Sequence, residues 1–147
     1  MTLSQTILHV EDDANDVLLF RHACVKSGVK LNVQTVADGD EALAYLEGTD
    51  QFADRKQHPL PKLVLLDLKM PKLNGFDVLN WMRQKKEFRR VPVVVLSSSN
   101  HDDDVRKAYD LGANSFLIKP VGFEALTDLA RAIEHYWLSL NADPEPA

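Results

Sequence analysis

The sequence of 147 residues contains one cysteine, Cys24, so no internal disulfide bond can form and a reducing compartment is expected. No apolar run approaches the length that spans a membrane, and residues 1–6 lack the basic and apolar regions of a signal peptide. A basic excess is missing as well, because the net charge is -5, whereas nucleic-acid-binding domains usually present a basic face. We therefore expect a cytoplasmic protein without membrane or nucleic-acid partners.

The remaining composition is that of an ordinary globular protein, with 45% hydrophobic and 27% charged residues. The length suits one domain with a single core. We expect this domain to occupy residues 1–147, with its core over about residues 5–141 and a frayed, acidic tail over residues 142–147.

Short apolar segments rich in β-branched residues alternate with segments that have helical spacing. The first kind predicts strands at Thr6–Val10, Leu31–Val36, Leu63–Leu66, Val91–Leu96 and Ser115–Ile118. The second kind follows each strand and is clearest in the last stretch, whose apolar residues are Leu126, Leu129, Ala130, Ile133 and Trp137. Five strand–helix repeats indicate an α/β fold, a doubly wound parallel sheet of five strands covered on both faces.

Two regions depart from this regularity. Thr49–Pro61 is a long polar connection that we expect to be a surface loop. The last helix is expected to continue to about Asn141. This extension adds four large apolar residues, namely Tyr136, Trp137, Leu138 and Leu140. Because one helix face cannot bury all four, we expect partial exposure and a role in self-association.

Polar residues follow the carboxyl ends of the predicted strands, which in a parallel sheet all lie at the edge that binds ligands. In chain order these residues are Glu11, Asp12, Asp67, Ser97 and Lys119. Because clustered carboxylates repel one another, the set predicts a bound cation, and Mg²⁺ prefers oxygen ligands. We expect Asp12 and Asp67 to bind Mg²⁺ directly and Glu11 to hold a metal-bound water. A backbone carbonyl just after Asp67 would add a further ligand.

The same residues suit phosphoryl transfer, which needs positioning and charge neutralisation more than covalent chemistry from the protein. The Asp67 carboxylate is ionised at neutral pH and can attack phosphorus directly. The metal would neutralise one phosphoryl oxygen and Lys119 a second, while Ser97 would donate a hydrogen bond to a third. The pattern therefore predicts that Asp67 accepts a phosphoryl group.

Four motifs in this order resemble the receiver domain of two-component response regulators: Val10–Asp13, Asp67–Pro71 with Gly75, Ser97, and Lys119–Pro120. The resemblance covers nearly the whole chain and implies a flavodoxin-like (βα)5 sheet with strand order 2-1-3-4-5. It also implies a cis peptide bond before Pro120. The roles that it implies are an acidic metal pair at Glu11 and Asp12, a phosphoacceptor at Asp67, a metal-binding backbone carbonyl at Lys69, switch residues at Ser97 and Phe116, and a phosphate-binding Lys119.

Some positions depart from the commonest pattern of that family. Glu11 stands where aspartate is more frequent, and Phe116 stands where tyrosine is often found, so burial should favour its inward position. Lys69 places a long cation beside the site, and we hypothesise that it changes how easily water reaches the phosphoaspartate. Asp13 is open to a second interpretation, because an acid is also favoured at the start of a helix.

The resemblance makes a histidine kinase the expected phosphoryl donor. Within the family, the loop before the third strand and the Tyr–Trp pair of the final helix are similar to single-domain regulators paired with bacterial phytochromes, which suggests such a kinase. Only one helix and a tail follow Lys119, so we expect no output domain. The signal would then pass to a downstream protein or phosphotransfer partner, with a homodimer formed through the fourth helix, fifth strand and fifth helix.

Other functions fit the sequence less well. A magnesium phosphatase usually carries a second aspartate two residues after its nucleophile, where this chain has Lys69, so we expect no turnover of outside substrates. A flavin-binding protein of this fold would need a Ser-, Thr- and Gly-rich loop after the first strand, where this chain has acids. The main alternative is a receiver-like module that binds proteins without phosphorylation, and the intact acidic site argues against it.

Overall fold

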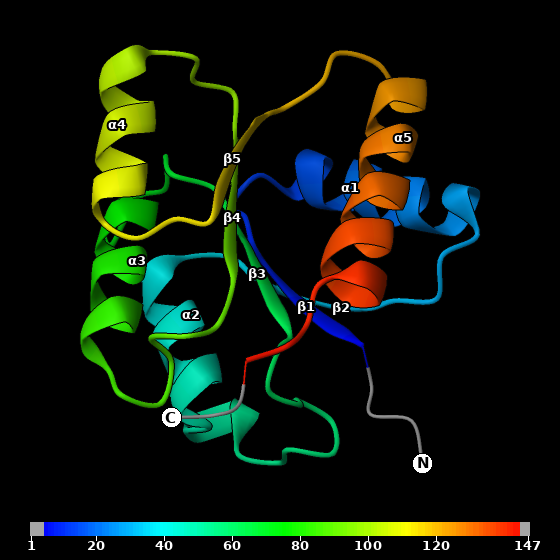
Figure 1. Cartoon of the computed structure of the whole chain (residues 1–147). Helices are drawn as coiled ribbons and strands as arrows, with labels where there is room; N and C mark the ends of the chain where they lie inside the picture. The colour runs from blue at the N-terminus through cyan, green and yellow to red at the C-terminus, as the bar shows by residue number, and fades with distance from the viewer. Residues whose placement is uncertain (1–4, 145–147) are drawn as a thin grey trace.

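The computed structural model describes residues 5–144, and its centre is a parallel sheet in the order β2-β1-β3-β4-β5 (Figure 1). The strands are β1 Thr6–Val10, β2 Asn32–Val36, β3 Leu63–Leu66, β4 Val93–Ser97 and β5 Ser115–Ile118. The expected fold class and strand order are confirmed, since every neighbouring pair is parallel. Two strands begin later than expected, β2 at Asn32 rather than Leu31 and β4 at Val93 rather than Val91, and β4 ends at Ser97 rather than Leu96. At β4 the Val91 amide donates to the Phe88 carbonyl in the preceding turn instead of joining the sheet.

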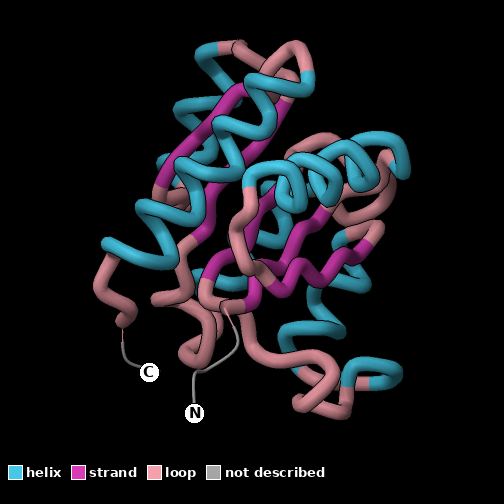
Figure 2. The backbone as a smooth tube through the Cα atoms, turned by 90° about the vertical axis from the view of Figure 1, so that its right-hand side faces the viewer, coloured by secondary structure: helices cyan, strands magenta, loops and turns pink. Residues whose placement is uncertain are grey.

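Helices cover both faces of the sheet (Figure 1). They are α1 Ala14–Ser27, α2 Gly39–Glu47, α3 Gly75–Gln84, α4 Asp102–Asp110 and α5 Phe123–Ile133. The view in Figure 2 has α1 and α5 in front of the strands, whereas α2, α3 and α4 lie behind them. Within residues 5–144, no helix is long and apolar enough to cross a membrane. Successive residues of β1 point to opposite faces of the sheet. Leu8 and Val10 pack in the apolar cluster beneath α2–α4, and Ile7 packs in the cluster beneath α1 and α5.

Side-chain caps fix the start of the helices that flank the candidate site. The Asp13 carboxylate accepts hydrogen bonds from the backbone amides of Asn15 (2.8 Å) and Asp16 (3.1 Å), which stabilises the first turn of α1. Asp13 is therefore a helix cap. At α3, Asn74 and Asp77 form a reciprocal capping box. These caps hold the first turns of α1 and α3 at the carboxyl edge of the sheet.

The connection at residues 49–61 runs over the surface, as expected, but its conformation is fixed by hydrogen bonds. It contains a short 3-10 helix, η1 Asp50–Phe52. The Arg55 guanidinium donates to the last carbonyls of α2, at Tyr45 and Leu46, both at 2.7 Å. The Tyr45 hydroxyl in turn donates to the Pro59 carbonyl at 2.8 Å. The loop is thereby anchored to the end of α2.

The chain remains helical after α5, but the helix changes type. Residues Glu134–Leu140 form a π-helix, η2, so the expected helical extension is confirmed to Leu140 with a different geometry. Tyr136 and Leu140 are exposed and Trp137 is half-buried, whereas Leu138 is buried and cannot contribute to an interface. The expectation that all four residues form the interface is therefore wrong for Leu138.

The start of the predicted tail contacts the body of the protein. The Asp143 carboxylate lies 3.1 Å from Lys62 Nζ, just before β3, in an ion pair at the surface. An ion pair between partly exposed side chains adds little stability, so the expected fraying of the tail stays a prediction. Residues 145–147 of the predicted tail lie outside the described residues.

Candidate functional site

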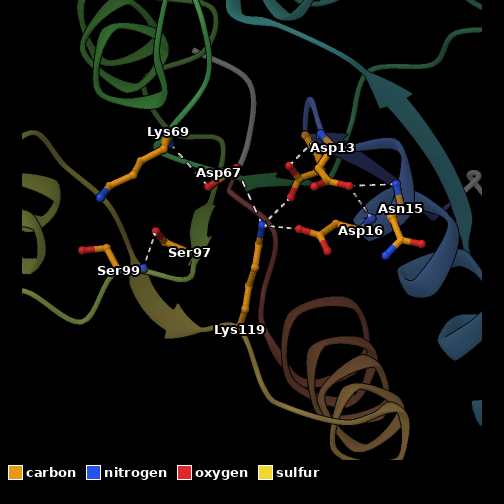
Figure 3. A network of polar contacts seen from close by, with 9 residues as sticks. Asp13, Asn15, Asp16, Asp67, Lys69, Ser97, Ser99 and Lys119 are labelled. Atoms are coloured by element: carbon orange, nitrogen blue, oxygen red, sulfur yellow. Dashed lines mark hydrogen bonds and ion pairs between the residues drawn. The ribbon is translucent and has the colours of Figure 1, made fainter.

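Three carboxylates meet at the carboxyl edge of the sheet, just after the ends of β1 and β3. Figure 3 shows one of them, Asp67, with the polar residues around it. One oxygen each from Glu11, Asp12 and Asp67 lies within 4.8 Å of the others. Glu11 and Asp67 are buried, with exposed fractions of 2% and 7%, whereas Asp12 is exposed to solvent. A set of carboxylate oxygens at this spacing, open on one side, fits a hard divalent cation that keeps several waters.

Glu11 is the most buried of these acids and is held from two sides. Its carboxylate accepts hydrogen bonds from Lys119 Nζ at 2.6 Å and from the Asp13 amide at 3.1 Å. Burial raises the pKa of Glu11 to about 7, although the hydrogen bonds from Lys119 and Asp13 act in the opposite direction. The Glu11 carboxylate is therefore poorly compensated by the protein alone, which favours a bound cation.

Asp67 is positioned by its backbone as much as by its side chain. Its amide donates to the Val10 carbonyl at 3.0 Å, which extends the pairing of β3 with β1 beyond the strand. One carboxylate oxygen accepts weakly from the Lys69 amide at 3.4 Å. A Cβ atom on Gly75 would lie 2.3 Å from the Asp67 carbonyl oxygen, so only glycine permits α3 to begin this close to the Asp67 loop.

Lys119 connects the two sides of the site, and the structure adds a partner that the sequence analysis missed. Its Nζ lies 2.8 Å from Asp16 Oδ2 and 3.7 Å from Asp67 Oδ2, besides the contact with Glu11. Burial alone would lower the pKa of Lys119, but hydrogen bonds to Asp16 and Glu11 outweigh burial and raise it, so the ammonium stays charged. The only sequence signal for Asp16 was its place in the first turn of the first predicted helix.

The predicted switch residues lie on the other side of Asp67. Ser97 is fully buried, and its hydroxyl oxygen accepts from the Ser99 amide at 3.1 Å. The Ser99 hydroxyl donates to Asp104 Oδ2 at 2.6 Å, which ties the β4–α4 loop to the first turn of α4. Phe116 is half-buried against the apolar cluster beneath α2–α4, so its ring is only partly in the inward position that we expected.

The Lys69 side chain is exposed and extends away from the Asp67 carboxylate, while its amide faces that carboxylate (Figure 3). The metal-binding role of its carbonyl stays a prediction. At the Lys119–Pro120 bond the expectation was wrong, because every peptide bond of the described residues is trans. Even before proline, the trans form is intrinsically favoured by roughly 0.5–1 kcal/mol.

Two other reactive side chains, His9 and Cys24, are structural. Burial lowers the pKa of His9 to about 3, so this ring is neutral and packs against Phe20 with centroids 4.8 Å apart. Cys24 is buried in α1, where burial raises the pKa of the thiol to about 11, against a smaller opposite effect of Arg21. Both side chains are held in apolar packing, so the chemistry of the site rests on carboxylates, a hydroxyl and an ammonium group.

We expect the Cys24 thiol of the native protein to resist disulfide reagents at about pH 8, because the reactive thiolate is scarce there and the sulfur is buried. The rate at which Cys24 reacts with the reagent should rise as the pH approaches the raised pKa of the thiol. Absorbance of the released thiolate from an aromatic disulfide reagent measures this, with the urea-unfolded chain as the fast control. Equal rates for native and unfolded protein would contradict the burial of Cys24.

An α/β sheet in the order 2-1-3-4-5 whose carboxyl edge gathers acidic residues, a lysine and a buried hydroxyl has the architecture of a receiver domain. The sequence matches the response regulator receiver domain family over residues 7–131, and the chain belongs to that family. This membership agrees with the resemblance drawn from the four motifs.

Relatives of known name or structure match nearly the whole chain. The probable methanogenesis regulatory protein FilR2 of Methanothrix harundinacea is 40% identical over 141 residues, covering 96% of this chain and 88% of FilR2. Response regulator Rcp1 of Synechocystis sp. is 35% identical over 134 residues, covering 91% of this chain and 89% of Rcp1. The phosphorylated cyanobacterial phytochrome response regulator RcpA superposes with a TM-score of 0.88 at 37% identity, covering 97% of this chain and 100% of RcpA. The Mn²⁺-bound form of Rcp1 gives a TM-score of 0.83 at 33% identity, with 96% and 99% covered. This chain is thus similar to response regulators of the phytochrome type.

Proposed function

We propose that this chain accepts a phosphoryl group from a histidine kinase onto Asp67, with Mg²⁺ as its cofactor, in the cytoplasm. One observation carries the proposal. An oxygen of the buried Asp67 carboxylate lies within 4.8 Å of one carboxylate oxygen each of Glu11 and Asp12, and Asp67 Oδ2 lies 3.7 Å from Lys119 Nζ. Asp67 supplies the nucleophile and the carboxylates supply a place for a divalent cation. The relative Rcp1 has been solved in a Mn²⁺-bound form, which supports a divalent cation here.

In the proposed reaction an Asp67 carboxylate oxygen forms a bond to phosphorus while the phosphorus–nitrogen bond of the kinase phosphohistidine breaks. Glu11, Asp12 and Asp67 would hold Mg²⁺, which when bound neutralises charge on the phosphoryl oxygens. Lys119 neutralises a second oxygen, and the Ser97 hydroxyl donates to a third. Water later hydrolyses the acyl phosphate. The chain thus catalyses only its own phosphorylation and dephosphorylation and acts on no outside substrate.

The phosphoryl group would change the surface formed by α4, β5 and α5. It brings roughly -1.5 to -2 charges and new acceptor oxygens, which attract the Ser97 hydroxyl. That movement breaks the contact between Ser97 and the Ser99 amide and pulls on the link from Ser99 to Asp104. Phe116, now half-buried, then fills the space that Ser97 leaves. A shift between two populations of this surface carries the signal.

A kinase of the bacterial phytochrome type is our proposed donor. The support is the full-length similarity to RcpA, a phytochrome response regulator, together with the anchored loop at residues 49–61 and the Tyr136–Trp137 pair. The rings of this pair are in edge contact, with centroids 4.9 Å apart. A downstream protein or phosphotransfer partner would receive the signal.

We also propose a homodimer through the α4-β5-α5 face. β5 is an edge strand, and a hollow of about 660 Å³ beside it is lined by Leu117, Leu129 and Trp137, among others. Ile118 and Tyr136 are exposed on the same elements, at 49% and 53%. Such exposed apolar area at a sheet edge favours self-association.

Replacing Tyr136 with glutamate should shift the protein from dimer to monomer, because the new charge would have to be buried in the interface. Sedimentation velocity at high protein concentration, with and without phosphorylation, measures the change. Val25→Glu is the matched control, since Val25 is 80% exposed on α1, outside the α4-β5-α5 face. A wild-type protein that is monomeric in both states would refute the dimer.

Replacing Lys69 with alanine should shorten the lifetime of the phosphoaspartate only modestly, because the Lys69 side chain extends away from the Asp67 carboxylate and would border the approach of water rather than block it. We expect a change of at most about tenfold, since the side chain is exposed and the residue contacts the carboxylate through its amide. Loss of the phosphoryl group after removal of the donor, followed by intact mass, gives the lifetime. Equal lifetimes would show that Lys69 has no such effect.

Incubation with Mg²⁺ and acetyl phosphate, followed by intact mass, tests the proposed function directly. We expect wild type to gain one phosphoryl group and Asp67→Asn to gain none. Omitting Mg²⁺ should prevent the reaction in wild type. Transfer from a phosphorylated phytochrome kinase is then compared with transfer from other histidine kinases. A folded wild-type protein that gains no phosphoryl group from any donor would instead favour the module that binds proteins without phosphorylation.

A further inference from the structure

Three carboxylates share the Lys119 ammonium, and the proposed phosphoacceptor is the most distant of them (Figure 3). Nζ lies 2.6 Å from Glu11 Oε1, 2.8 Å from Asp16 Oδ2 and 3.7 Å from Asp67 Oδ2. An ammonium group has three N–H donors, and Glu11 and Asp16 accept from two of them. Lys119 is therefore held by Glu11 and Asp16, at a separation from Asp67 that is too long for a hydrogen bond.

Asp16 differs from Glu11 in its relation to the acidic cluster. Glu11 belongs to the group of three carboxylates that approach one another, so a cation bound there would neutralise part of the Glu11 charge and weaken its attraction for Lys119. Asp16 is not part of that group. Its hold on Lys119 would therefore persist when a cation is present. Both partners are partly withdrawn from solvent, with side-chain exposures of 38% for Asp16 and 20% for Lys119. Such a pair is stronger than one between fully exposed side chains.

A simpler role for Asp16 is that of an acid in the first turn of α1, where it interacts favourably with the helix dipole. That role needs no contact with a side chain 103 positions further along the chain. The 2.8 Å hydrogen bond to Lys119 is thus an additional property of this residue.

We propose that Asp16 is a positioning residue that competes with the phosphoryl group on Asp67 for the Lys119 ammonium. The inference rests on the proposed function of Asp67 and adds a residue that limits how far the phosphorylated state is stabilised. When phosphoryl oxygens arrive, the Lys119 ammonium has to move toward Asp67 to donate its third N–H to them, because Nζ lies 3.7 Å from Asp67 Oδ2. The contact with Asp16 opposes that movement.

Binding of beryllofluoride, a phosphoryl analogue, at saturating Mg²⁺ measures the competition at equilibrium. We expect Asp16→Asn to tighten this binding by about three- to tenfold, the range of a partly exposed ion pair. Asp13→Asn is the matched control, because it removes the same charge from the same helix end and keeps a capping side chain. The Asp13 carboxylate caps the helix through backbone amides rather than through Lys119. Equal tightening in both variants, unchanged binding or weaker binding in Asp16→Asn would overturn the proposal.

A second readout is independent of the phosphoryl site. In the metal-free protein, the NMR signal of the Lys119 Nζ–H group reports its hydrogen bonds, and Lys119→Met identifies that signal. Asp16→Asn should shift it and Asp13→Asn should not, while both variants stay folded at the temperature of the measurement, which circular dichroism checks. If wild type binds no beryllofluoride, the proposed function fails, while the Nζ–H signal still decides whether Asp16 holds Lys119. A signal that Asp16→Asn leaves unshifted contradicts the inference even if beryllofluoride binds.

Discussion

Replacing Gly75 with alanine should lower the free energy of unfolding by about 3 kcal/mol, the upper range for overpacking a close contact. The added Cβ would meet the Asp67 carbonyl oxygen at 2.3 Å and the Leu68 Cα at 2.7 Å, and both are backbone atoms that cannot rotate away. Helix propensity predicts the opposite sign, because alanine in a helix is more stable than glycine by up to about 1 kcal/mol. Urea unfolding therefore distinguishes the two effects by sign.

The same substitution should also weaken the divalent cation site, because the Asp67 loop must move to accept the new methyl group. We expect roughly tenfold weaker Mg²⁺ binding, as for other changes that displace a metal ligand indirectly. Gly28→Ala is a useful control, since a Cβ there meets no atom within 4 Å and only the positive φ of 77° opposes it. A Gly75→Ala protein as stable as wild type would show that α3 does not need this close approach.

Replacing Arg83 with methionine should lower the free energy of unfolding by about 3 kcal/mol, since several carbonyls would lose a charged donor. The half-buried guanidinium of Arg83 donates five hydrogen bonds within the described structure. The acceptors are the carbonyls of Gly112, Phe88, Arg89 and Val91 and the side-chain oxygen of Asn114. One side chain therefore joins α3 to the loops that precede β4 and β5.

Methionine keeps the apolar stem of Arg83, so the loss measures the hydrogen bonds rather than a cavity. Arg83→Lys should fail to restore stability, because a single ammonium cannot reach acceptors that a planar guanidinium bridges. Arg89→Met, at an exposed position next to the same loop, should stay within about 0.5 kcal/mol of wild type. Chemical unfolding of the variants gives these differences. If Arg83→Met lowered the free energy of unfolding by less than Arg89→Met does, water would replace the hydrogen bonds of the guanidinium with no loss of stability.

The strand pattern alone placed the main chemical groups correctly. Asp67, Ser97 and Lys119 each lie at the end of a strand or just beyond it, so their approach at one edge follows from the parallel sheet. Three strand ranges agree with the structure residue for residue, because their β-branched and apolar runs stop sharply at charged or turn residues. The shifts at the start of β2 and β4 fall where strands meet turns, and at β4 a turn hydrogen bond competes with the sheet.

Other contacts could not be predicted, because they depend on groups that the sequence does not place. In a helical pattern, Arg83 is indistinguishable from a solvated cation until the loops around it are known. Asp16 similarly fits a helix start, and its contact with Lys119 depends on where the packing of α1 against α5 places the first turn of α1. Leu138 was assigned to the interface with its three neighbours because one helix face cannot bury all four, and the sequence does not show the π-helix that changes which residues share a face.

The ion pair between Lys119 and Glu11 joins positions 108 residues apart, nearly the two ends of the fold. It can form only after β5 has taken its place beside β4, because the Lys119 amide donates to the Ser97 carbonyl at the end of that pairing. A chain still emerging from the ribosome therefore has Asp67 long before it has a complete site. The proposed competence to receive a phosphoryl group should therefore arise late in synthesis and folding, after the last strand has joined the sheet.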